Sequence, residues 1–206
     1  MFGLRRGTSM SEIIKKILTN VLAALYQPFV FSIILAVLLT FLYMYANEFG
    51  WKMLLKRWVD SFKNSKEFRK VCVLTFYITM ILFKTLLNRS LWPNPLSNVI
   101  GVWGLYRENG TLTTEVVENF ILFVPFTVLM FWCFREKVFG RIVSLSKIIW
   151  QAVKIVFLFS LVIEFLQLFL CVGTFQLSDL FYNTLGGLVG GFVYWCGYKF
   201  VHKSKK

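Results

Sequence analysis

Five long apolar blocks constrain this sequence more than any other feature. Each is about 20 residues long, the length that a helix needs to cross the roughly 30 Å hydrocarbon layer of a bilayer. Of the 206 residues, 57% are hydrophobic and only 16% are charged, whereas about a quarter are charged in a soluble domain. We therefore predict an all-α integral membrane bundle of about five transmembrane helices, with spans at about 28–46, 71–87, 117–134, 148–171 and 178–200.

The segment before the first block follows a different pattern. Residues 1–9 resemble a dispensable leader, and apolar side chains then recur at helical spacing over residues 13–25 with polar residues on the opposite face. This pattern predicts an amphipathic helix lying at a membrane surface. A signal peptide is less favoured, because no small-residue cleavage site follows. The expected organisation is a leader and interfacial helix (1–27), a bundle (28–200) and a basic tail (201–206).

Basic residues are unevenly distributed among the connections, and the net charge is +13. Lysine and arginine concentrate in residues 47–70, in residues 135–147 and near the carboxyl end, whereas residues 88–116 and 172–177 carry few or none. We interpret this charge as a topology signal rather than as a sign of nucleic-acid binding, which predicts a cytoplasmic carboxyl terminus. The side of the amino terminus stays open, because residues 13–46 also fit a re-entrant hairpin hinged near Pro28.

Polar side chains inside the apolar blocks are few. A carboxylate near the middle of a spanning helix costs about 2.5 to 3.5 kcal/mol on insertion scales, so such residues are candidates for a functional site. Glu164 and Gln167 share one helix face, as do Asp179 and Asn183. The short turn over residues 172–177 makes their two helices antiparallel neighbours. All four side chains are therefore expected at a similar depth.

Two further polar residues belong to the same side of the membrane, since Arg89 ends the second span and Asn119 begins the third. We predict that six side chains from four helices converge in the outer half of the bundle. Glu164 and Asp179 are the catalytic candidates, and the substrate-binding candidates are Arg89, Asn119, Gln167 and Asn183. Each also has a structural alternative as a helix cap, an interhelical hydrogen bond or a boundary anchor. The inner half offers only Lys154.

Four glycines in the last block form two interleaved small-xxx-small pairs: Gly186, Gly187, Gly190 and Gly191. Because they lack side chains, they predict close helix packing against the fourth span. They are not a phosphate-binding loop, since no Gly-Lys-Ser/Thr follows. The single histidine, His202, lies in the basic tail, and no metal site or cofactor is predicted.

These residues together resemble the VanZ-like family of bacterial membrane proteins. The resemblance covers about residues 84–195 and rests on Arg89, Asn119 through Pro125-Phe126, Glu164-x-x-Gln167, Asp179, Asn183 and Gly186-Gly187. Thr127 replaces a frequent glycine, and Gln176 and Ser178 stand where acidic residues are common. Losing those carboxylates weakens the case for a divalent cation, which needs several oxygen ligands.

The resemblance implies a role in the envelope of a bacterial cell. The family's namesake is associated with low-level resistance to teicoplanin, a lipid-bearing glycopeptide that acts on cell-wall precursors at the outer membrane face. The implied partners are membrane lipid and a lipid-linked cell-wall precursor or a lipoglycopeptide. There are two alternatives: a small proton-coupled transporter with Glu164 as its proton relay, and a non-catalytic membrane scaffold. The sequence leaves open whether the protein is an enzyme and whether it forms oligomers.

Overall fold

The computed structural model describes the backbone of residues 29–87, 89–107, 110–140 and 144–203, and every regular element among them is a helix. The chain divides into two compact units, Met1–Leu54 and Leu55–Lys206. The predicted leader and the amphipathic helix over 13–25 lie outside the described residues. The all-α class predicted from the sequence is confirmed.

The first described helix, α2 (Phe29–Phe49), coincides with the predicted span at 28–46. Gly50 ends it with a backbone φ of +82°, a left-handed conformation that glycine adopts without steric cost. The amide of Gly50 still donates to the carbonyl of Ala46, at 2.6 Å, and a second helix begins at the next residue. The chain therefore continues as a helix where a connection was expected.

That second helix, α3 (Trp51–Asn64), is amphipathic, and none of its residues is buried. One face carries the apolar side chains Trp51, Leu54, Leu55, Trp58, Val59 and Phe62, and the rest of the surface carries Lys52, Lys56, Arg57, Asp60 and Lys63. Our prediction of a plain basic connection over 47–70 was thus wrong. Exposed tryptophans on one face with lysines beside them are typical of a helix that lies at a membrane surface.

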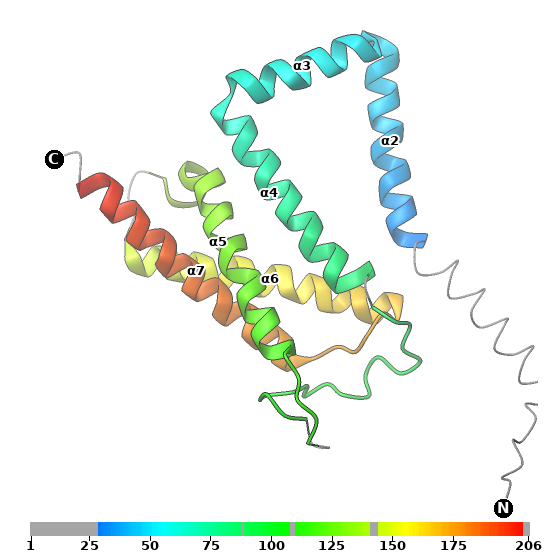
Figure 1. The fold of residues 1–206 in the computed structure, drawn as a ribbon, viewed down its shortest axis with the longest axis vertical. Helices are drawn as coiled ribbons and strands as arrows, with labels where there is room; N and C mark the ends of the chain where they lie inside the picture. The colour runs from blue at the N-terminus through cyan, green and yellow to red at the C-terminus, as the bar shows by residue number, and fades with distance from the viewer. Residues whose placement is uncertain (1–28, 88, 108–109, 141–143, 204–206) are drawn as a thin grey trace, which may run out of the picture. The chain divides into compact units, whose positions relative to one another are not determined.

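Four longer elements make up the rest of the second unit. α4 (Lys66–Leu82) begins at the cap Ser65 and continues into a π-helical turn, η1 (Phe83–Leu87). α5 (Glu115–Phe139), α6 (Leu145–Leu170) and α7 (Leu177–Lys203) follow. α7 packs against both α5 and α6, and α4 packs against α5 (Figure 1). Aromatic rings fill the centre, where Phe126 stacks on Phe159 with 4.9 Å between ring centroids.

Three described helical segments are long and apolar enough to cross a membrane: Lys66–Leu87, Glu115–Phe139 and Leu145–Leu170. Large apolar side chains on them remain exposed, as Phe76 and Phe169 do at 67% and 80%, which suits contact with lipid rather than water. α7 covers the predicted span 178–200, but its polar first turns and its glycines lower its hydropathy. A multi-pass membrane protein is supported, and the number of five spans stays a prediction.

The connection between α4 and α5 lies along the turn between α6 and α7 at one end of this unit (Figure 1). Backbone hydrogen bonds join them: the Trp92 amide donates to the Cys171 carbonyl at 2.7 Å, and the Leu177 amide to the Val99 carbonyl at 2.8 Å. The predicted polar residues lie beneath this junction. These hydrogen bonds therefore hold the connection before α5 and the turn before α7 together over the candidate site.

Candidate functional site

Glu164 is the deepest acidic group of the candidate site. Its side chain on α6 is 1% exposed, and its Oε2 accepts a hydrogen bond from the backbone amide of Gln176 at 2.9 Å. The carboxyl group thereby links the carboxyl-terminal part of α6 to the residue that directly precedes α7. Asp179 is near enough to interact electrostatically with Glu164, so two acidic groups share this end of the bundle.

Gln167 lies one turn further along α6 and is also 1% exposed. Its Nε2 donates to the backbone carbonyl of Thr85 at 2.8 Å. Thr85 belongs to the π-helical turn, and π-helical turns occur frequently at functional sites. The Gln167 Oε1 is buried and receives no hydrogen bond from the described residues. The amide side chain therefore joins α6 to the end of α4 and keeps one acceptor unused.

Asp179 on α7 is the second buried acidic group. Its Oδ2 lies 3.9 Å from Nη2 of Arg89, which follows the π-helical turn. The side chains of Asn119 on α5 and of Ser178 interact with the same carboxyl group. Three segments distant in the sequence thus meet at Asp179, and the ion pair holds the Arg89 guanidinium at this end of the bundle.

Asn183 lies one turn below Asp179 on α7. Its Nδ2 donates to Oγ of Ser160 on α6 at 2.8 Å, and its Oδ1 is buried and accepts no hydrogen bond from described residues. Ser160 in turn precedes Glu164 by one helical turn. All six residues singled out from the sequence are therefore at one end of the bundle, on the four segments expected.

A cavity of about 890 Å³ opens above these groups, and we call it the Arg89 cavity. Its wall comes from the connection before α5 and from the turn before α7. The lining residues that carry its chemistry are Arg89, Arg107, Gln176, Trp92, Trp103 and Tyr106. Neither Glu164 nor Asp179 lines it, but each contacts a residue that does. The two carboxyl groups therefore lie behind the cavity wall, and a single residue separates each of them from the cavity: Gln176 for Glu164 and Arg89 for Asp179.

Gln176 was not among the residues singled out from the sequence, although it links Glu164 to the cavity. Its Nε2 donates to Thr174 Oγ1 at 2.6 Å, and its Oε1 accepts from Ser178 Oγ at 3.4 Å. Gly101 of the overlying connection packs so closely that a Cβ there would lie 1.9 Å from Ser178 Oγ. A departure from the usual acidic residues was the only signal for Gln176 and Ser178.

Two further ion pairs surround the start of α5. Arg107 Nη2 lies 2.6 Å from Glu115 Oε1, and Lys84 pairs with Glu118. Arg107 and Glu115 both line the Arg89 cavity, so their ion pair fixes its wall where α5 begins, whereas Lys84 and Glu118 lie outside the lining. Among the described residues, no three His, Cys, Asp or Glu side chains gather in the manner of a metal site.

The glycines of α7 pack on two neighbours. A Cβ at Gly187 or Gly191 would meet Val156 or Ala152 of α6, the helix that the sequence pattern pointed to. A Cβ at Gly186 or Gly190 would instead meet the backbone of α5. One pair therefore serves each interface, and α7 brings its polar first turns close to both helices.

Comparison with known families assigns the chain as a whole. The VanZ/LLP1 family model matches residues 29–200, which is most of the sequence. The chain belongs to the VanZ-like family. No curated protein and no solved structure compared with it gave a match. The geometry described above is therefore the main basis for placing function within this VanZ-like protein.

Proposed function

We propose that this VanZ-like protein acts at the outer face of the bacterial cell membrane, in low-level glycopeptide resistance or a related envelope response. The Arg89 cavity would bind the polar part of a lipid-linked cell-wall precursor or of a lipid-bearing glycopeptide such as teicoplanin. The observation that carries the proposal is the position of this cavity directly over the buried carboxyl groups of Glu164 and Asp179.

The lining of the Arg89 cavity suits such a ligand. Guanidinium groups bind phosphate and carboxylate with paired hydrogen bonds, and Arg89 and Arg107 both line the wall. Trp92 and Trp103 are about half exposed, at 47% and 49%, and offer flat apolar faces beside them. Arg89 binds the anionic group of the ligand, and Asp179 orients the Arg89 guanidinium. Glu164, which lies behind Gln176, exchanges a proton or balances the charge of Arg89.

The distribution of buried polar groups favours action at this surface over proton transport. A transporter needs polar groups that continue through the bundle to the other side. In the described part of the second unit, the buried polar side chains lie at this end or extend only to the middle of the helices, at Ser160 and Thr127. The scaffold alternative requires only that the helices stay packed. It therefore predicts full function in any variant of these polar residues that still folds.

We expect Arg89→Gln to lower teicoplanin resistance to that of a host strain without the protein. The substitution removes the charge that Asp179 holds at the cavity wall. Teicoplanin susceptibility in a host made resistant by the wild-type protein measures the effect, with membrane levels compared by immunoblot. Lys84→Gln is the matched control, because Lys84 pairs with Glu118 outside the cavity lining. Full resistance in an abundant Arg89→Gln variant would exclude the Arg89 cavity as the site.

We also expect a green fluorescent protein fused to the carboxyl terminus to fluoresce, and an alkaline phosphatase fused there to be inactive. The reason is the concentration of lysine and arginine in the connections at that end of the helices. Paired fusions expressed in a bacterial host measure this orientation. An active phosphatase fusion would show the opposite topology, with the Arg89 cavity on the cytoplasmic side.

A further inference from the structure

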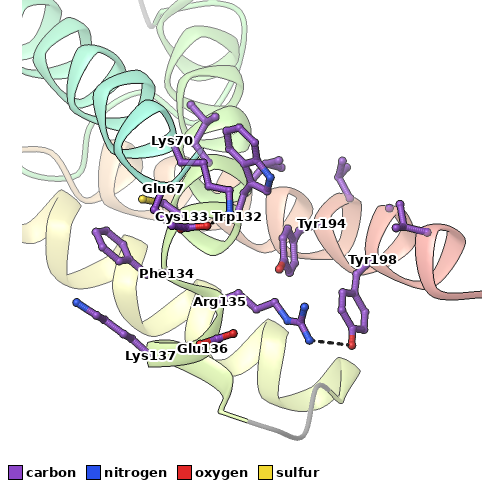
Figure 2. Close-up of a pocket in the computed structure, with 15 residues that line it drawn as sticks. Glu67, Lys70, Trp132, Cys133, Phe134, Arg135, Glu136, Lys137, Tyr194 and Tyr198 are labelled. Carbon is purple, nitrogen blue, oxygen red and sulfur yellow. Dashed lines mark hydrogen bonds and ion pairs between the residues drawn. The ribbon is translucent and has the colours of Figure 1, made fainter. Parts of the chain in front are cut away.

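A second cavity, of about 1030 Å³, lies at the opposite end of the same helices. The start of α4 and the ends of α5 and α7 line it (Figure 2). Within the predicted spans, the sequence offers only Lys154 as a candidate polar group in this half. The lining instead gains charged residues from the predicted connections 47–70 and 135–147, namely Glu67, Lys70, Arg135, Glu136 and Lys137. We call it the Arg135 cavity.

Arg135 is the distinctive group of this cavity. α5 leaves helical geometry at Phe134, whose φ and ψ are −115° and 28°, and Arg135 reaches across to α7 (Figure 2). Its guanidinium carbon lies 4.8 Å from the centre of the Tyr198 ring, and its Nη2 donates to the Tyr198 hydroxyl at 3.3 Å. The side chain is therefore held in one orientation by an aromatic ring.

The charge of Arg135 has no acidic partner in the described structure. None of the ion pairs among described residues includes it, and its Nε is buried without a hydrogen-bond acceptor. A buried donor left without a partner is destabilising, and more so when it carries a charge. By contrast, Lys70 pairs with Glu67 at 2.7 Å and lies over the Trp132 ring. Arg135 thus keeps hydrogen-bonding capacity that the described residues do not use.

Apart from Glu136 and Lys137, the remaining wall is apolar and aromatic. Trp132, Tyr194 and Tyr198 contribute rings, and Val193 and Val201 contribute aliphatic surface. A guanidinium group next to such a wall suits a molecule with an anionic head and an apolar body. Basic pockets between spanning helices at the membrane boundary bind phosphate head groups of anionic lipids. Arginine is the side chain best matched to phosphate geometry.

We propose that the Arg135 cavity binds the phosphate group of an anionic amphiphile. Arg135 donates to the phosphate oxygens through the N–H groups that Tyr198 leaves unused, and the aromatic wall contacts the apolar part. The site is separate from the Arg89 cavity, at the other end of α5 and α7. The same chemistry fits a phospholipid of the surrounding leaflet and a soluble phosphate ester, and the experiment below separates the two.

Lipid retention by the purified full-length protein tests the proposal. The protein is exposed to equal amounts of phosphatidylglycerol and phosphatidylcholine in detergent, and bound lipid is measured by native mass spectrometry. We expect the wild type to retain phosphatidylglycerol preferentially and Arg135→Gln to reduce that preference about tenfold, the loss of one charge-assisted contact. Arg135→Lys should retain part of the preference. Lys199→Gln, which removes a cation stacked on Trp195 outside this cavity, should leave it unchanged.

Three results would overturn the proposal: no lipid preference in the wild type, an unchanged preference in Arg135→Gln, or an equal loss in Lys199→Gln. Tyr198→Phe keeps the ring and removes the hydroxyl, so it should weaken the preference even if Arg135→Gln does not fold. Excess inorganic phosphate distinguishes the source. Displacement of phosphatidylglycerol by phosphate supports the site with a soluble phosphate ester as occupant, and retention supports it with the lipid.

Discussion

Replacing Gly186 with alanine is expected to separate α7 from α5 and to lower the free energy of unfolding by about 1 to 3 kcal/mol or more, the range for overpacking a tight interface. A Cβ at Gly186 would lie 2.1 Å from the carbonyl oxygen of Phe120, and one at Gly190 would lie 2.4 Å from that of Val124. Both contacts are to backbone, which cannot rotate aside as a side chain does. The whole of α5 would have to move.

A matched control lies on the same helix. Gly197 also belongs to α7, but a Cβ there meets nothing within 4 Å. Gly197→Ala should therefore leave stability unchanged or raise it slightly, since alanine is the better helix former. Thermal unfolding in detergent, followed by tryptophan fluorescence, measures both variants. Equal midpoints for Gly186→Ala and Gly197→Ala would show that α5 and α7 do not pack as described.

The length of the apolar blocks predicts the positions of most helices but misses one. The apolar blocks predicted the positions of α2, α5, α6 and α7 to within a few residues, because a lipid-facing helix must be apolar over its whole length. Length alone did not reveal α3. Its apolar residues alternate with lysines at helical spacing, so the segment has low average hydropathy. Its basic residues predict the topology of the chain but not this helix.

The candidate site shows a similar division. Glu164 and Asp179 stood out from the sequence because a carboxylate is costly in an apolar helix. Gln176 did not, since a polar residue is ordinary in a turn, and its role depends on its backbone amide, which donates to Glu164. Arg135 was also overlooked. An arginine at the end of a span is expected on its own, and only the approach of α7 gives it Tyr198.

The chemistry of Glu164 suggests why an acid occupies this position. In the structure its carboxyl group accepts one backbone hydrogen bond, from Gln176. The carbonyl oxygen of a glutamine side chain would accept the same bond, and an amide is cheaper than a carboxylate to place in a membrane. If packing were its only role, glutamine would serve as well. We therefore expect the acid itself to be used, for proton exchange or for charge balance with Arg89.

Glu164→Gln should accordingly keep the fold and lose the function. We expect its unfolding midpoint to match that of the wild type, because the hydrogen bond to Gln176 is retained, while teicoplanin resistance falls to that of a strain without the protein. Glu118→Gln is the control, since it removes an acid at the same end of the bundle that pairs with Lys84 outside the cavity. Asp179→Asn gives a second measurement if Glu164→Gln does not accumulate. Wild-type resistance in abundant, stable Glu164→Gln and Asp179→Asn variants would leave these side chains a packing role only, which is the scaffold alternative.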